Sequence, residues 1–155
     1  MGSAGRPGYD MRMPTPEYSD TTTEGIRIGA AAFYIPEHSD PDRDRYVFGY
    51  NILIANHSDT PVQLLSRHWT IIDASGHREE VRGPGVVGQT PRLEPGQAFK
   101  YQSFCPLSTP WGTMEGTYQM QRDDGTLFDA RIGRFYLFKP RALSPRPSSR
   151  EEQNA

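Results

Sequence analysis

The sequence contains a single cysteine, Cys105, among 155 residues. One thiol cannot form an internal disulfide, and it excludes a zinc site built from several cysteines. No stretch approaches the roughly 18 apolar residues that a membrane-spanning helix needs, and the N-terminus lacks the apolar core of a signal peptide. A net charge of −2 does not favour nucleic-acid binding. We therefore expect a soluble, cytoplasmic protein with no membrane span and no nucleic-acid partner.

Catalytic and metal-binding patterns are also lacking. None of the four histidines pairs with another at metal-ligand spacing, and no G-x-S-x-G nucleophile motif occurs. The neighbouring carboxylates Glu79 and Glu80 fit a charged edge strand, and Asp123 and Asp124 fit a turn. Cys105 fits a small buried residue better than a nucleophile. The sequence therefore predicts a protein that is not an enzyme and has no cofactor.

Composition divides the chain into three parts. Residues 1–23 and 140–155 are rich in Gly, Pro, Ser, Arg and Glu, with little apolar periodicity. Such segments bury too little apolar surface to offset the entropy of ordering, so both are predicted to be disordered tails. Residues 24–139 are predicted to form one domain.

Apolar and polar residues alternate with period two through this domain, and no window shows a helical stripe. The pattern predicts about seven strands, and the even-numbered residues Tyr46, Phe48, Tyr50, Ile52 and Ile54 form the apolar face of one of them. Short strands separated by turns favour an all-β, antiparallel, immunoglobulin/fibronectin type III-like sandwich, with a small β-barrel as the alternative.

Particular residues refine this prediction. Trp69 falls on the third strand, where immunoglobulin-like sandwiches bury a tryptophan, and Tyr118 lies in a run shaped like a tyrosine corner. The last strand changes phase at Gly133, which predicts a bulge. In the strand over residues 64–73, Leu65 and Trp69 are expected to face inward. Arg67 shares their register, so it should find a carboxylate or lie where the sandwich opens.

The run from Gly83 to Gly88 reads G-x-G-x-x-G, the pattern of a dinucleotide-binding loop. That site requires a helix after the glycines, and Pro91 and Pro95 leave no room for one. The loop is instead a bulged crossover between sheets, a backbone nest for an anion, or a docking surface if Val86 and Val87 are exposed.

Five separated blocks resemble the ApaG family, and together they span residues 24–138. The blocks are VQLLSRHW at 62–69, GPGVVGQTP at 83–91, LEPGQAFKY at 93–101, YVFGYNI at 46–52 and GTMEGTY at 112–118. Thr90 departs from the family pattern, which has Gln or another polar residue there, and both tails lie outside it.

This resemblance implies a fibronectin type III-like sandwich. It also implies an association, by name, with cobalt and magnesium efflux and with diadenosine-tetraphosphate hydrolase operons. Related domains of eukaryotic F-box and polymerase-interacting proteins look like protein-interaction units. The family has no established catalytic residues to carry over. Since a soluble domain cannot itself conduct ions, it could at most regulate a transporter.

Our leading hypothesis is a non-enzymatic interaction module that docks an unidentified protein, with a link to cobalt/magnesium homeostasis. The alternative is a sensor that binds a nucleotide or pyrophosphate, such as a diadenosine polyphosphate, at the glycine loop. A third hypothesis is weak divalent-metal binding by His77, Glu79 and Glu80, and exposed edge strands could also form a homodimer. The predicted partner or anion surface consists of Arg67, His68, Gly83, Gly85, Val86, Gly88 and Gln89.

Overall fold

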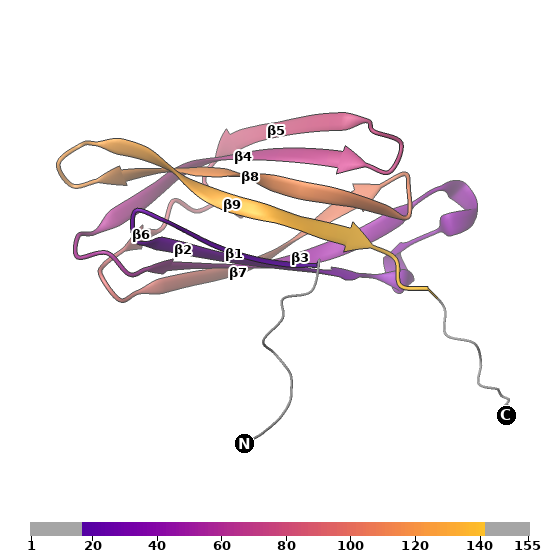
Figure 1. Cartoon of the computed structure of the whole chain (residues 1–155), viewed down its shortest axis with the longest axis horizontal. Coiled ribbons are helices and arrows are strands. Elements are labelled where there is room, and N and C mark those ends of the chain that lie inside the picture. The colour runs from indigo at the N-terminus through magenta and orange to yellow at the C-terminus, as the bar shows by residue number, and fades with distance from the viewer. Residues whose placement is uncertain (1–16, 142–155) are drawn as a thin grey trace, which may run out of the picture.

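The computed structural model of the protein describes residues 17–141; the rest of both predicted tails lies outside the described residues. Two antiparallel sheets pack face to face (Figure 1). The first has the order β1 (Tyr18–Thr23), β2 (Ile26–Tyr34), β3 (Tyr46–Asn56), β7 (Ala98–Leu107). The second has the order β5 (Arg78–Pro84), β4 (Val62–Asp73), β8 (Trp111–Arg122), β9 (Leu127–Phe138), and the short β6 (Arg92–Leu93) also pairs with β4. The predicted antiparallel sandwich is confirmed, with β1 and β6 in addition to the seven expected strands.

The helical segments within residues 17–141 are two 3₁₀ turns, Pro36–His38 and Pro41–Arg43, between β2 and β3. Neither is long or apolar enough to cross a membrane.

Strand β1 corrects the predicted N-terminal boundary, because residues 18–23 were expected to be disordered. Its sequence YSDTTT has no apolar face, so hydrophobic periodicity could not reveal it. The strand is instead held by backbone pairing along β2 and by two links to β9. The Ser19 hydroxyl donates to the Gly133 carbonyl at 2.8 Å, and the Arg131 amide donates to Thr23 Oγ1 at 3.1 Å.

The predicted bulge at Gly133 is confirmed, since the pairing of β8 with β9 shifts register between Met114 and Gly116, opposite Gly133. A Cβ atom at Gly133 would approach Thr21 Oγ1 to 2.5 Å. The glycine therefore allows β9 to approach β1 closely and close this side of the sandwich.

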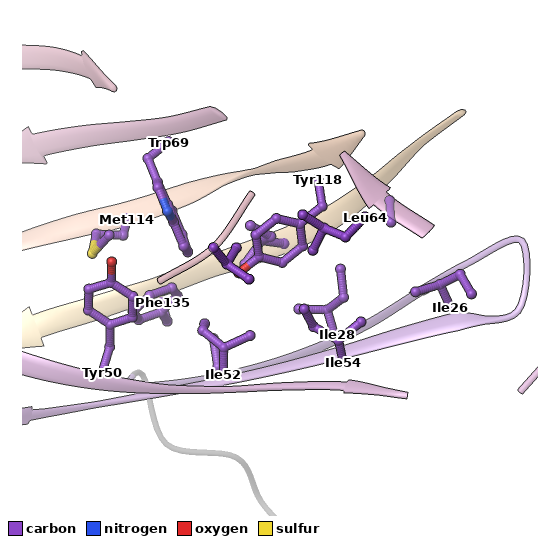
Figure 2. Packing of buried hydrophobic residues seen from close by; sticks show 14 of the residues in the cluster. Ile26, Ile28, Tyr50, Ile52, Ile54, Leu64, Trp69, Met114, Tyr118 and Phe135 are labelled. Carbon is purple, nitrogen blue, oxygen red and sulfur yellow. The ribbon is translucent and has the colours of Figure 1, made fainter. Parts of the chain in front are cut away.

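Aromatic rings occupy the middle of the core (Figure 2). Trp69 on β4 is 3% exposed, and its ring meets those of Tyr50, Tyr118 and Phe135 at centroid distances of 5.5, 6.3 and 6.0 Å, each close to edge-on. Such edge-to-face geometry adds roughly 0.5–1.5 kcal/mol per pair to the stabilisation from burial. The even-numbered face of β3 supplies the opposite wall, as predicted.

Two predictions about inward-facing residues need correction. The register of β4 against β8 shifts between Leu64 and Ser66, so Leu64 enters the core and Leu65 is only half-buried. Tyr118 is fully buried, but it does not form a tyrosine corner, because its hydroxyl hydrogen-bonds to the Tyr101 hydroxyl on the other sheet instead of to upstream backbone.

The two tryptophans provide a test of this core. Trp69→Ala is expected to lower the free energy of unfolding by about 3–5 kcal/mol, because it leaves a cavity between the sheets. Trp111 is 44% exposed and stacks on Tyr136, so Trp111→Ala should cost about 1 kcal/mol or less. Urea unfolding followed by circular dichroism measures both values, and equal losses would contradict this description of the core.

Candidate functional site

The glycine loop is a tight, internally bonded turn between β5 and β6. Val86 and Gln89 exchange both backbone hydrogen bonds, each at 2.8 Å. Val87 and Gly88, between them, have φ angles of +43° and +78°. Two central residues with positive φ are typical of a two-residue type I′ hairpin turn. The sequence thus correctly located a shaped loop, and its conformation is that of a hairpin tip.

Gly85 anchors the base of this turn. Its amide donates to the Leu65 carbonyl at 2.8 Å, and its φ is +60°. A Cβ atom at this position would lie 2.2 Å from the Gln89 carbonyl oxygen. Glycine is required here by both the backbone conformation and the close approach of the two arms of the turn.

The two valines of the turn have opposite environments. Val86 is 0% exposed and belongs to the hydrophobic core, whereas Val87 is 52% exposed. The prediction that Val86 contributes to a binding surface is therefore wrong. The hairpin turns Val86 inward to anchor the loop and places Val87 at the tip.

Arg67 hydrogen-bonds to the base of the loop. Its Nη1 group donates to the carbonyls of Pro84 and Gly85 at 2.9 and 3.0 Å. A Cβ atom at Gly83 would lie 2.9 Å from Arg67 Nη2, so the glycine makes room for the guanidinium. Arg67 has thus found backbone carbonyls instead of the expected carboxylate.

Arg67 also lies where the sandwich opens, the second of the two expected placements. Opposite the β1–β9 side, β7 and β5 are the outer strands of their sheets, and a cleft of about 250 Å³ separates them. Arg67, Glu79 and mostly apolar residues line this cleft, the apolar ones including Trp69, Val81, Phe104, Cys105 and Met114. Burial raises the pKa of the Cys105 thiol to about 12, so the thiol stays protonated and unreactive at neutral pH.

His68 faces the opposite side of β4 from Arg67, because successive residues of a strand point to opposite faces. Its Nε2 atom contacts Glu80 Oε1 at 2.5 Å, and Arg78 Nε donates to Glu80 Oε2 at 2.6 Å. The two side chains therefore leave β4 on opposite faces. A hollow of about 460 Å³ on the outer face, beside the base of the loop, nevertheless brings together Arg67, His68 and Gly83 of the predicted surface. Arg82, Pro84, Gln119 and Asp129 also line it.

The same alternation separates the proposed metal ligands. Glu79 lines the cleft, whereas Glu80 faces outward and is engaged by His68 and Arg78. Within residues 17–141, no group of three or more His, Cys, Asp or Glu side chains is arranged to hold a metal ion. The structure does not bring His77, Glu79 and Glu80 together.

The anion-nest hypothesis depends on free amides in the loop. The amides of Gly85, Val86 and Gln89 all donate to backbone carbonyls of the protein. Most of the amide donors that a phosphate would need are therefore already hydrogen-bonded within the protein.

Sequence reasoning missed the exposed residues of β7. Lys100, Gln102 and Phe104 share the outer face of this strand, and Phe104 is 57% exposed. The alternation with Phe99 and Tyr101 signals that face, but only the sheet order shows that β7 is an edge strand.

Glu80 generates a prediction about pH. Hydrogen bonds from His68 and Arg78 lower the pKa of its carboxyl from 4.5 to about 2. Because the folded pKa lies below the ordinary value, this interaction stabilises the protein above about pH 4.5 and is lost as the pH falls toward 2. An NMR titration should show the Glu80 pKa rising toward 4.5 in His68→Gln, and an unchanged pKa would contradict the assignment of its cause.

Gly85 and Gly88 form a matched pair for testing the turn. Gly85→Ala should destabilise by more than the roughly 1–2 kcal/mol of a left-handed non-glycine residue, because its Cβ also meets the Gln89 carbonyl. A Cβ added at Gly88 would have no atom of residues 17–141 within 4 Å, and asparagine tolerates positive φ, so Gly88→Asn should cost far less. Thermal and urea unfolding measure both, and equal losses would argue against the close approach.

Comparisons with known proteins agree with this fold. The family model described as the ApaG domain matches residues 36–122. The chain is 52% identical over 126 residues to Protein ApaG of Anaeromyxobacter dehalogenans strain 2CP-C, covering 81% of this chain and 99% of the relative. It is 53% identical over 118 residues to Protein ApaG of Brucella anthropi, covering 76% and 91%.

Among solved structures, the chain is similar to the crystal structure of the ApaA protein from Bordetella pertussis. The TM-score is 0.73 at 43% sequence identity, over 83% of this chain and all of that one. A match across most of both chains at this identity, together with the family model, establishes that the chain belongs to the ApaG family.

Proposed function

We propose that this chain is a non-enzymatic protein-interaction module and that its partner docks on the glycine turn, with Val87 as the central apolar contact. The outer-face hollow beside the turn, where His68, Arg82 and Gln119 lie, supplies the polar rim of the surface. An exposed apolar contact surrounded by polar groups is the usual arrangement of a protein interface.

The observation that carries this proposal is the conformation of Val87. A β-branched residue at φ +43° is strained by roughly 1–2 kcal/mol, and asparagine or glycine ordinarily occupies this turn position. The Val87 side chain is half exposed, so the free energy gained by burying it in the folded chain is too small to offset that strain. Local strain that folding does not require is typical of functional sites.

The loop is also held in one conformation before a partner arrives. Arg67 fixes the carbonyls of Pro84 and Gly85, and Val86 is buried beneath the tip. A preordered loop loses little conformational entropy on binding, which favours affinity. In this proposal Arg67, Gly83 and Gly85 are positioning residues, whereas Val87, Gln89 and His68 are available for contact.

The alternative function, a nucleotide or pyrophosphate sensor, is supported by Arg82 and His68 in the same hollow. Asp129 also lines this hollow, and a carboxylate there would repel a polyphosphate. We therefore rank this function second. Loop-localised NMR shifts on addition of ATP or diadenosine tetraphosphate would favour it. A link to cobalt or magnesium homeostasis would, in our proposal, run through the bound protein partner.

Val87→Asn separates binding from folding. Asparagine suits the left-handed turn position, so this variant should be about 1 kcal/mol more stable than the parent chain. It also removes the apolar tip, and its recovery of the partner from an extract of the native cell should therefore fall at least about tenfold. Quantitative mass spectrometry of the captured proteins and urea unfolding measure the two effects.

Trp111→Gln is the matched control, because it also removes an exposed apolar side chain. Trp111 begins β8, whereas Gln119, which lies beside the turn, is near the other end of that strand. The same partner should be captured by the parent chain and by this control, and lost with Val87→Asn. Equal recovery by all three proteins would reject the turn as the binding surface.

A further inference from the structure

We propose that two copies of this chain associate through β7, by antiparallel pairing centred on Gln102 of each copy. This inference concerns a different surface from the glycine turn and goes beyond the function proposed above. It rests on the hydrogen-bonding edge of β7, on the residues that flank that edge, and on an apolar groove next to it.

The backbone of β7 has one free edge. Asn56 N–H donates to the Gln97 carbonyl at 2.9 Å, and the pairing of β3 with β7 continues from there. The backbone N–H and C=O groups of the odd-numbered residues of β7 therefore point toward β3. Pro106 has no N–H and pairs with Val47, which agrees with even-numbered residues facing away from β3. The backbone groups of Ala98, Lys100, Gln102 and Phe104 therefore point outward, and no strand within residues 17–141 pairs with them.

The other sheet edges are protected. β1 and β9 are linked to each other, and Arg78, Glu80, Arg82 and Pro84 flank the free edge of β5. Charged side chains and proline are the usual means of preventing edge pairing. The ten residues of β7 contain one charge, Lys100, and one proline, Pro106, which lies at the end of the strand. The edge over residues 98–104 is therefore the least protected among the strands of residues 17–141 and is open to a further strand.

The side chains select both the partner and the register. With Gln102 opposite Gln102 of the second copy, Lys100 lies opposite Phe104, which is 57% exposed in the single chain. A cation beside an aromatic ring is favourable, whereas pairing centred on Lys100 would place two like charges face to face. Centring on Gln102 also uses almost the full length of the strand.

An apolar groove on the same sheet face adds a second contact. This groove, of about 420 Å³, is lined by Tyr18, Gly29, Ala31, Asn51, Leu53 and Lys100. It borders β7 at Lys100, opposite which the proposed pairing places Phe104 of the second copy. Each exposed phenylalanine then comes to lie beside an apolar groove of the other chain, so the surface is complementary to itself.

Sedimentation velocity over a concentration range tests the association. The parent chain should form dimers reversibly, and Phe104→Lys should weaken dimerisation at least about tenfold, because it places lysines opposite each other twice. Gln119→Lys, on the outer face of the central strand β8, is the matched control and should dimerise like the parent chain. A parent chain that stays monomeric up to a concentration of about 1 mM, or a Phe104→Lys variant that dimerises equally, would overturn the proposal.

Disulfide trapping tests the register. In a Cys105→Ala background, Gln102→Cys should cross-link two copies under mild oxidation, because directly paired residues have Cα atoms about 5.5 Å apart. Lys100→Cys should cross-link much more slowly, since the two copies of residue 100 would be four residues out of register, about 13 Å apart. Equal rates for the two variants would reject pairing centred on Gln102.

Discussion

The packing of Trp69 between the two sheets is the interaction on which the rest of this structure depends. Its ring meets Tyr50 from the first sheet and Tyr118 and Phe135 from its own sheet, all near the middle of the sandwich. Edge-on aromatic contacts are directional, so they fix how the sheets are placed as well as how strongly they adhere. The strand that carries Trp69 thereby acquires a defined position relative to both sheets.

The position of β4 in turn determines the position of the glycine loop, through Arg67. Arg67 lies two residues before Trp69 on the same face of β4, and its guanidinium reaches the carbonyls at the base of the turn. The packing of Trp69 positions Arg67, and the hydrogen bonds from Arg67 position the base of the loop. The buried side chain of Val86 holds the loop against the core. The strain at Val87 can persist because the surrounding contacts determine the turn conformation.

The sandwich is asymmetric at its two sides, and this asymmetry separates its two proposed surfaces. One side is closed by β1 against the bulge of β9, where Gly133 allows close approach. The other side leaves the edges of β5 and β7 apart, with several charges flanking β5 and a single one, Lys100, flanking β7. A partner at the turn and a second copy at β7 would therefore occupy different parts of the molecule.

Local pattern determined much of this protein. Period-two alternation identified seven strands, the inward face of β3, the bulge at Gly133 and the burial of Trp69, because each depends on which side of one strand a residue occupies. The five sequence blocks also identified the family. The strand β1 gave no such signal, since polar residues paired through backbone hydrogen bonds look like an unstructured tail.

Tertiary structure decided what alternation cannot express. A register shift exchanged Leu64 for Leu65 in the core, and the hairpin buried Val86 while exposing Val87. Arg67 and His68, adjacent in sequence, were assigned to opposite faces, and β7 became an edge only through the order of strands in its sheet. These outcomes depend on which strands pair and in what register, and pairing is set by contacts between segments far apart in the chain.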